Sequence, residues 1–343
     1  MSRPHIVIER NIPFIAGILD PYADIDYLAA PDITPEAMRD ADALVTRTRT
    51  RCDASLLDGS RCRLIATATI GTDHIDLPYC RERGITVANA PGCNAPAVAQ
   101  YVYAAIFTWL RERGDTRRPA DLTLGIVGVG NVGRIVERWG RELGFRVLLC
   151  DPPRAAAEGA DAFVDIDTIA AESDIITFHT PLTRTGDCPT AGLCDSRLLA
   201  VMRRRPLLIN SSRGPVVDNA ALVGALDSGA VADAVIDCWE GEPQISPALL
   251  SRAFIATPHI AGYSREGKIR ATSMSLHSVC RHFGLPALDV AETVPPLSES
   301  RPCSPAAILR SYDPLADTAR LRAKPAAFEA LRNSYTLRPE VTP

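Results

Sequence analysis

A glycine-rich turn with the spacing G-x-G-x-x-G occupies residues 128–133, well inside the 343-residue chain. It follows the apolar run 122–127 and opens a segment of helical character that ends at Gly144. A strand, such a turn and a helix form the phosphate-binding unit of dinucleotide-binding folds, where the turn follows the first strand of the domain. The position of the turn therefore predicts a separate lobe before the nucleotide-binding domain.

The first ninety residues have the pattern of such a lobe. Continuous apolar runs of strand length lie at 5–8, 43–46, 64–69 and 85–88. Helix starts stand between them at Thr34-Pro35-Glu36 and Asp76-Leu77-Pro78, where a capping residue precedes a proline. This alternation predicts a parallel sheet with helices on both faces.

The same alternation continues after residue 94. Apolar residues recur at helical spacing from Asn94 to Arg113, with Gly114 as the stop, and we expect this helix to connect the lobes. A second helical pattern covers about 266–283 and could return the chain to the first lobe. The strands that we predict between these helices lie at 122–128, 145–150, 174–179, 206–211, 231–237 and 253–257. Six strands with intervening helices predict a doubly wound Rossmann domain.

The composition restricts the partners. The net charge is −4 and 23% of the residues are charged, so neither nucleic acid nor a membrane surface is an expected partner. The N-terminus has no signal-like apolar segment, and no internal run is long enough to span a bilayer. None of the ten cysteines forms a C-x-x-C motif, which favours buried thiols over a metal site. We therefore expect a cytoplasmic protein without a bound metal.

The glycine-rich turn specifies the cofactor together with the strand that follows it. Gly128, Gly130 and Gly133 allow a tight turn and close backbone approach, and Asn131 and Val132 place amides at a helix N-terminus that favours a pyrophosphate.

The next predicted strand ends at Asp151. A carboxylate there accepts hydrogen bonds from ribose hydroxyls and repels a 2′-phosphate, which favours NAD over NADP. Arg154 nearby keeps NADP open, and a purely structural glycine turn is the alternative to any cofactor site.

Three polar motifs follow predicted strands of the second lobe. Arg213 ends one strand and has the planar fork that binds a carboxylate. Glu240 and Glu242 flank a glycine after the next strand, and His259 stands in Thr-Pro-His-Ile-Ala-Gly after the last one. Each residue alone could be structural. Together they suit hydride transfer at a 2-hydroxy acid, with Arg on the carboxylate and a Glu-supported His on the hydroxyl proton.

At these motifs the chain resembles the D-2-hydroxyacid dehydrogenase family. That resemblance implies a Rossmann NAD domain inserted into a flavodoxin-like substrate domain, and catalytic roles for Arg213, Glu242 and His259. It suggests a substrate lobe over 1–93, an NAD domain over 94–265, a return helix over 266–285 and a shortened, partly irregular dimerisation-type segment over 286–343.

Further strings resemble one branch of the family: 66–74 (Ala-Thr-Ala-Thr-Ile-Gly-Thr-Asp-His), 150–154 (Cys-Asp-Pro-Pro-Arg), 178–181 (Phe-His-Thr-Pro) and 259–263 (His-Ile-Ala-Gly-Tyr). This branch oxidises 4-phospho-D-erythronate with NAD on the way to pyridoxal phosphate, and forms homodimers. The resemblance implies that NAD contacts Asp151, Thr180, Asp237 and Gly262, and that substrate contacts Thr48, Thr69 and Tyr263.

The substrate phosphate requires a cation. We predict Arg47 for this role, with Arg49 as second choice, although both arginines could instead pair with surface acids. Two alternatives to this function remain at this point. One is another 2-hydroxyacid dehydrogenase, acting on phosphoglycerate or on hydroxypyruvate or glyoxylate; the other is a non-catalytic NAD-sensing protein of the same fold.

Overall fold

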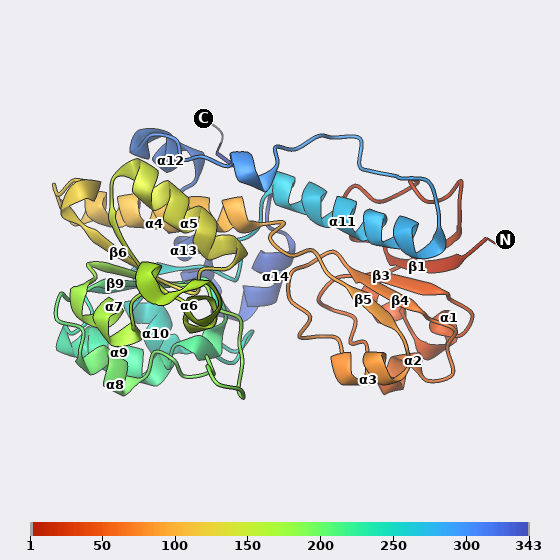
Figure 1. Ribbon diagram of the computed structural model, residues 1–343, viewed down its shortest axis with the longest axis horizontal. Helices are drawn as coiled ribbons and strands as arrows, with labels where there is room; N and C mark the ends of the chain where they lie inside the picture. Colours follow the sequence, from red (N-terminus) through yellow and green to blue (C-terminus); the bar gives the residue numbers. More distant parts are fainter. Residues whose placement is uncertain (1–2, 342–343) are drawn as a thin grey trace. The chain divides into compact units, whose positions relative to one another are not determined.

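The computed structural model describes residues 3–341, which divide into two compact α/β units (Figure 1). Unit 1 contains the chain up to Asn94 and the segment Arg265–Leu297. Unit 2 contains Ala95–Ser264 and the chain from Ser298 onward. The chain therefore changes unit at 94/95, 264/265 and 297/298, whereas the sequence predicts a return segment over 266–285 only.

Unit 1 is built on a five-stranded parallel sheet. Its strands are β1 (His5–Glu9), β2 (Asp24–Leu28), β3 (Ala43–Thr46), β4 (Leu64–Thr67) and β5 (Thr86–Ala88), in the spatial order β2-β1-β3-β4-β5. This is the strand order of flavodoxin-like folds, as predicted. We did not predict β2, because this edge strand lacks the continuous apolar run of the other strands and exposes Asp24 and Asp26.

Helices cover both faces of this sheet (Figure 1). On one face lies the long helix α11 (Arg265–Phe283), which packs Ile269 and Leu276 against Ile6, Ile8 and Val45. On the other face the alternate strand residues Val7, Leu44 and Ile65 pack in a second cluster. The helices on that side are α1 (Pro35–Met38), α2 (Ala54–Leu57) and α3 (Leu77–Glu82), and the 3₁₀ helix η1 spans Ala30–Asp32. The predicted caps of α1 and α3 are present, since Thr34 and Asp76 accept hydrogen bonds from backbone amides.

Unit 2 contains the predicted six-stranded parallel sheet. Its strands are β6 (Thr123–Val127), β7 (Arg146–Cys150), β8 (Ile175–Phe178), β9 (Leu207–Asn210), β10 (Asp233–Ile236) and β11 (Ile255–Ala256), in the order β11-β10-β9-β8-β6-β7. From β6 the chain first goes to β7 on one side and then to β8 on the other. In such sheets ligands bind at the carboxyl ends of the strands beside this reversal.

The helices of unit 2 include the C-terminal segment. They are α4 (Ala95–Glu112), α5 (Asn131–Leu143), α6 (Pro152–Glu158), α7 (Ile166–Glu172), α8 (Ser196–Ala200), α9 (Asn219–Ser228), α10 (Pro247–Arg252), α12 (Pro305–Ser311), α13 (Pro314–Ala323) and α14 (Phe328–Asn333). The 3₁₀ helices are η2 (Pro119–Asp121), η3 (Ala160–Ala162), η4 (Gly214–Val216) and η6 (Pro325–Ala327), while η5 (Leu297–Glu299) begins at the last residue of unit 1.

Helix α4 lies beside α5 and α12, and sixteen of its residues are buried (Figure 1). Leu321 of α13 and Phe328 of α14 belong to the same apolar core as Leu249. The C-terminal segment is therefore an integral part of the NAD-type unit.

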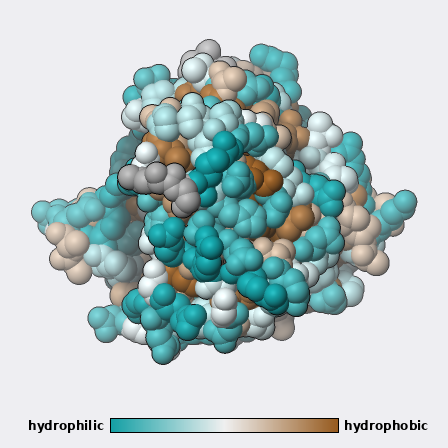
Figure 2. All heavy atoms as spheres, turned by 90° about the vertical axis from the view of Figure 1, so that its right-hand side faces the viewer, coloured by the Kyte–Doolittle hydropathy of each residue, from teal (hydrophilic) through white to brown (hydrophobic). Residues whose placement is uncertain are grey.

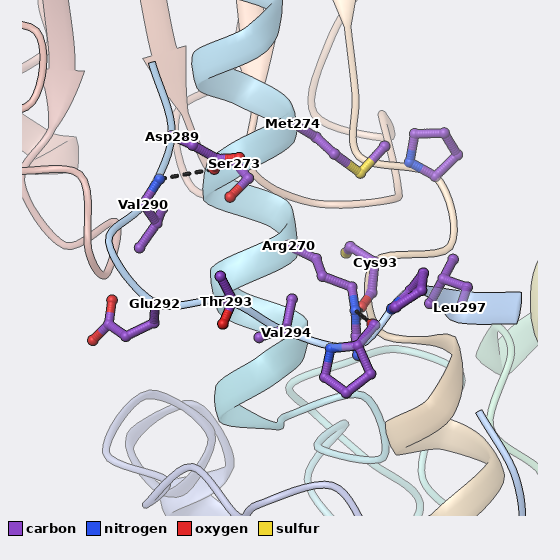
Figure 3. A pocket seen from close by; sticks show the side chains of 13 residues that line it. Cys93, Arg270, Ser273, Met274, Asp289, Val290, Glu292, Thr293, Val294 and Leu297 are labelled. Atoms are coloured by element: carbon purple, nitrogen blue, oxygen red, sulfur yellow. Dashed lines mark hydrogen bonds between the residues drawn. The ribbon is translucent and has the colours of Figure 1, made fainter. Parts of the chain in front are cut away.

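Arg270 of α11 links the segments of unit 1 that lead to two of the unit boundaries (Figure 3). Its Nη1 donates to the Cys93 carbonyl at 3.2 Å, and its Nε and Nη2 donate to the Pro295 carbonyl at 3.3 and 3.1 Å. A groove along α11, lined also by Met274 and Val290, surrounds these contacts. No residue that we predicted for substrate or NAD lines it.

The surface is mainly hydrophilic on the face drawn in Figure 2, with small and separate hydrophobic patches. Among the described residues, the large hydrophobic side chains that are exposed are Tyr22, Leu77 and Val201. None of the described helices combines the length and the apolar composition that a bilayer crossing requires.

A neutral histidine follows β8. His179 places its Nε2 3.0 Å from the Thr177 hydroxyl, and burial lowers the pKa of its imidazole to about 3. The pKa in the unfolded chain is about 6.5, so the stability that the neutral ring provides is complete above pH 6.5 and is lost as the pH falls towards about 3.

We expect His179→Gln to fold and to show a smaller drop in melting temperature between pH 7.5 and 4.5 than wild type. The exposed His277→Gln serves as control, and equal drops in wild type and His179→Gln would contradict this assignment.

Candidate active site

His259 and Glu242 form a hydrogen-bonded pair in unit 2. The His259 Nδ1 lies 2.8 Å from the Glu242 Oε2, and the side chains are 26% and 19% exposed. The second Glu242 oxygen accepts the Trp239 amide at 2.8 Å. Because the carboxylate accepts, Nδ1 carries a proton, and in the neutral ring Nε2 keeps a lone pair. Nε2 has no hydrogen-bond partner within the part of the chain that the structure describes.

The electrostatics keep Glu242 ionised. Burial alone would raise the pKa of its carboxyl, but the hydrogen bond and the charge of His259 outweigh this effect. The Trp239 amide and the charge of Arg332 act in the same direction, and the pKa of Glu242 is lowered overall. A carboxylate in this state orients the imidazole and stabilises its protonated form.

The loop that carries His259 is organised around the buried carboxylate of Asp237. Its Oδ1 accepts from the Thr257 hydroxyl at 2.6 Å and from the Ile260 amide at 2.8 Å, while Oδ2 accepts the Ala261 amide at 2.9 Å. His259 itself has a left-handed backbone with φ of 56°, and its amide donates to the Asp237 carbonyl. Asp237 is fully buried, so its carboxylate supports the loop. Its predicted contact with NAD stays a prediction.

Arg213 lies at the end of β9, close to the Glu242 loop. Gly214 packs so tightly on that loop that a Cβ at this position would lie 1.9 Å from the Trp239 carbonyl oxygen. Asn210 connects the two motifs, because its Nδ2 donates to the Arg213 carbonyl at 3.0 Å and its carbonyl accepts the Asp237 amide. No sequence pattern marks Asn210 apart from its place at a strand end.

Arg213, Glu242 and His259 therefore meet at the carboxyl ends of β9, β10 and β11. The Cys238 thiol lies within the same group of charges. Glu242 and Arg213 both act on it electrostatically, and burial is the main reason that its pKa is raised.

Cys238, Glu242 and His259 are also the set of potential metal ligands among the described residues, with their ligand atoms within 4.8 Å of one another. The hydrogen bond between Glu242 and His259 already occupies one ligand atom of each residue.

The glycine-rich turn has the shape that a pyrophosphate requires. Gly128 has φ of 86°, and a Cβ there would lie 2.8 Å from Thr180. A Cβ at Gly133 would lie 2.1 Å from the Gly128 carbonyl oxygen, so this glycine allows α5 to pack on the turn. A Cβ at Gly130 would point into open space at the N-terminus of α5, where Asn131 and Val132 begin the helix.

Asp151 follows β7 and fixes the turn from the other side. Its Oδ2 accepts the Val129 amide at 2.7 Å, and its Oδ1 accepts the Arg154 amide. Each oxygen keeps a second lone pair for a ribose hydroxyl. Arg154 forms a two-bonded ion pair with Glu158 and donates to the Val129 carbonyl, so its guanidinium is already committed. This arrangement supports NAD over NADP.

Two buried hydroxyls that follow the neighbouring strands β8 and β9 have no hydrogen-bond partner among the described residues. They are the Thr180 Oγ1, beside Gly128, and the Ser211 Oγ, at the end of β9. Unpaired buried hydroxyls are costly, so a ligand that bonds to these two would remove that cost. With the open space at Gly130, they fit a bound NAD. Gly262 is half-buried in the loop after His259, where a contact with NAD stays a prediction.

The predicted substrate residues of unit 1 also lie at strand ends. Arg47 and Thr48 follow β3, and Thr69 follows β4, which pairs with β3 in parallel. Thr48 is exposed, and the Thr69 hydroxyl donates to the Gly71 carbonyl. The Arg47 amide donates to the buried Glu9, and its guanidinium donates to the Asn11 carbonyl at 3.2 Å. These residues therefore lie at the carboxyl end of the same two neighbouring strands of the unit 1 sheet.

Two arginines of the C-terminal segment contact the loop 259–263 and were not predicted. Arg338 is 6% exposed, stacks on Tyr312 and donates to the carbonyls of Ile260, Ala261 and Tyr263, as well as Ala97. Arg332 donates from Nε to the Tyr263 hydroxyl at 3.2 Å. No local pattern marks them, because the contacts join positions about seventy residues apart.

Comparisons with known proteins show to which family this chain belongs. The family described as "D-isomer specific 2-hydroxyacid dehydrogenase, NAD binding domain" matches residues 94–261. An erythronate-4-phosphate dehydrogenase of Bacteroides thetaiotaomicron is 47% identical over 98% of this chain and 97% of its own length. One of Marinobacter nauticus is 43% identical over 98% of this chain and 92% of its own length. The chain belongs to the D-isomer specific 2-hydroxyacid dehydrogenases, among the erythronate-4-phosphate dehydrogenases.

Solved structures agree on the fold. A D-lactate dehydrogenase of Aquifex aeolicus, complexed with NAD and lactic acid, has a TM-score of 0.67 at 23% identity and covers 84% of this chain and all of its own. A holo D-mandelate dehydrogenase of Rhodotorula graminis has a TM-score of 0.70 at 24% identity, over 86% of this chain and 99% of its own. The predicted family, Rossmann fold, NAD cofactor and dehydrogenase class are confirmed.

Two of the three glycines of the turn provide a matched test of the cofactor site. Gly133→Ala forces a Cβ against the Gly128 carbonyl, and we expect it to lower the melting temperature by several degrees or more. Gly130→Ala meets no protein atom, so we expect an unchanged melting temperature but NAD binding weakened at least about tenfold. Calorimetry and NAD titration measure both effects. NAD binding by Gly130→Ala with wild-type affinity would show that the pyrophosphate lies elsewhere.

Arg338 provides a test of the loop support. Arg338→Met keeps most of the aliphatic side chain but removes the donor to four backbone carbonyls, those of Ala97, Ile260, Ala261 and Tyr263. We expect unfolding to become easier by about 3 kcal/mol, and kcat to fall more than the affinity for NAD. Urea unfolding and steady-state kinetics measure the two effects, with the exposed Arg310→Met as control. Wild-type kcat in a folded Arg338→Met protein would rule out this positioning role.

Proposed function

We propose that this dehydrogenase oxidises 4-phospho-D-erythronate at C2 to (R)-3-hydroxy-2-oxo-4-phosphooxybutanoate, in the synthesis of pyridoxal 5′-phosphate. The observation that carries the proposal is the His259–Glu242 pair at 2.8 Å, with Nε2 unpartnered, in a chain 47% identical to an erythronate-4-phosphate dehydrogenase. The substrate itself is an inference from the relatives' name, joined to the chemistry of the site.

His259 is the acid/base in this proposal. Its Nε2 accepts the proton of the C2 hydroxyl as the C=O bond forms, while Nδ1 keeps its hydrogen bond to Glu242. The imidazolium that results is stabilised by the ionised Glu242, which remains a carboxylate throughout. In the reverse reaction the same nitrogen returns the proton to the carbonyl oxygen.

Arg213 holds the substrate carboxylate. Its place at the end of β9, next to the Glu242 loop, sets a two-pronged cation beside the acid/base. Fixing the carboxylate orients C2, because the carboxylate is bonded directly to that carbon. The neighbouring cation also stabilises the 2-oxo acid that forms.

NAD, when bound, accepts the hydride that leaves C2. Gly128, Gly130 and Gly133, with the amides of Asn131 and Val132, would hold its pyrophosphate, and Asp151 would hold its adenine ribose. Thr180, Asp237 and Gly262 are the further residues that we assign to it. The Thr180 hydroxyl has the strongest support of these three, because it is buried without a partner.

We also propose that Thr48 and Thr69 of unit 1 and Tyr263 of unit 2 contact the substrate, and that Arg47 contacts its phosphate. The assignments of Thr48 and Thr69 are supported by their positions at the carboxyl ends of β3 and β4, which pair in parallel. Arg47 already donates to the Asn11 carbonyl, but only one of its five N–H donors is used there. A cytoplasmic homodimer completes the proposal, supported by the resemblance to a branch that dimerises.

An NAD-reduction assay tests the substrate. We expect the kcat/KM for 4-phospho-D-erythronate to be at least about a hundredfold above the values for 3-phosphoglycerate and D-lactate. The reason is that several of the proposed site residues would contact the four-carbon phosphate ester. Hydrazine traps the 2-oxo product, since the oxidation is uphill. His259→Asn is expected to lower kcat by about 10²–10⁴-fold with NAD binding intact.

Each outcome of the assay has a distinct meaning. Preference for 3-phosphoglycerate would make the chain another 2-hydroxyacid dehydrogenase. Absence of turnover with all three acids, in protein that binds NAD, would favour a sensor. Turnover unaffected by His259→Asn would remove the histidine from the mechanism while leaving the substrate assignment in place.

A further inference from the structure

Arg332 of α14 lies in the candidate active site although it is far from it in sequence. Its Nε donates to the hydroxyl of Tyr263, and its side chain is only 18% exposed. Its charge acts on Glu242 and on the Cys238 thiol, the group on which Arg213 also acts. A second cation therefore stands near the His259–Glu242 pair, within the same unit.

The guanidinium of Arg332 is not saturated. Among the described residues, only its Nε–H makes a hydrogen bond. Its Nη1 lies 3.6 Å from the carboxylate of Glu329, beyond hydrogen-bonding distance, and this acid is 45% exposed. None of its nitrogens is both sealed from solvent and unpartnered. Its four remaining N–H donors make no hydrogen bond to the described residues, and part of the side chain is exposed.

The proposed substrate carries two anionic ends. Arg213 accounts for the carboxylate at C1, and His259 for the hydroxyl at C2. The phosphate at C4 carries close to two negative charges and three acceptor oxygens, which one arginine neutralises only in part. A planar guanidinium held at one corner by Tyr263, with its other donors open, suits such a group.

We propose that Arg332 binds the phosphate of the substrate, together with Tyr263, from the same unit that carries His259. This inference rests on the proposed function and adds a cation to Arg47. Glu329 is the counter-charge of Arg332 in the absence of substrate, and the phosphate takes its place. A purely structural Arg332, which only holds Tyr263, is the competing reading that the experiment excludes.

The test compares Arg332→Gln, Arg332→Lys and the exposed control Arg310→Gln. With saturating NAD, we expect Arg332→Gln to raise the KM for 4-phospho-D-erythronate about 30-fold or more and to change kcat less than about threefold. The inhibition constant of inorganic phosphate should rise by a similar factor. Arg332→Lys keeps the charge and should recover part of both losses, while Arg310→Gln should resemble wild type.

A fall in kcat with unchanged KM and unchanged phosphate inhibition would overturn the proposal, since that pattern marks a residue that only positions Tyr263. Failure of the proposed function is a separate result. If wild type does not oxidise 4-phospho-D-erythronate, the rise in melting temperature caused by inorganic phosphate with NADH present still tests Arg332. A rise in wild type and Arg310→Gln that is lost in Arg332→Gln would support the anion site, and an equal rise in all three would refute it.

Discussion

The carboxylate of Asp237 lies out of reach of water, and a hydroxyl and two amides of the segment 257–261 converge on it. Because a buried carboxylate is tolerated only where donors surround it, this residue determines how the segment after β11 turns. Tyr101 of α4 extends the network by donating to the Thr257 hydroxyl, which donates to Asp237. The left-handed backbone of His259 is held inside this network, so the direction of the imidazole depends on a residue that does not touch it.

The remaining active-site residues are fixed by backbone contacts of the same kind. Gly214 has no room for a side chain against Trp239, and Asn210 bonds to the loops on both sides of it. Arg213 and Glu242 follow the neighbouring strands β9 and β10, and the spacing of these strands sets where their loops lie. Such a site is preorganised, since the groups that we propose to act on the substrate are held by rigid elements.

Much of this arrangement could be predicted from local pattern. The glycines at 128–133 must form a tight turn, and an arginine, a glutamate and a histidine that each follow a parallel strand must meet at one edge of the sheet. Edge strand β2 was missed because one of its faces is polar, which removes the continuous apolar run. Asp237 was assigned to NAD by resemblance, whereas its burial became visible only with the loop around it. Arg332 and Arg338 could not be found, since helical periodicity describes neighbours within a few residues and these contacts join segments that only the folded core brings together.

The contacts of Arg338 also bear on how the protein is made. A ribosome that has translated residues 1–264 has delivered Arg213, Glu242 and His259, together with the strands that carry them. The loop 260–263 acquires the donor for its carbonyls only after Arg338 has left the exit tunnel. During synthesis the histidine thus exists for some seventy residues without this support. A nascent chain, or one trimmed by a protease before Arg338, would carry the proposed acid/base and its carboxylate partner and still lack the finished loop around them.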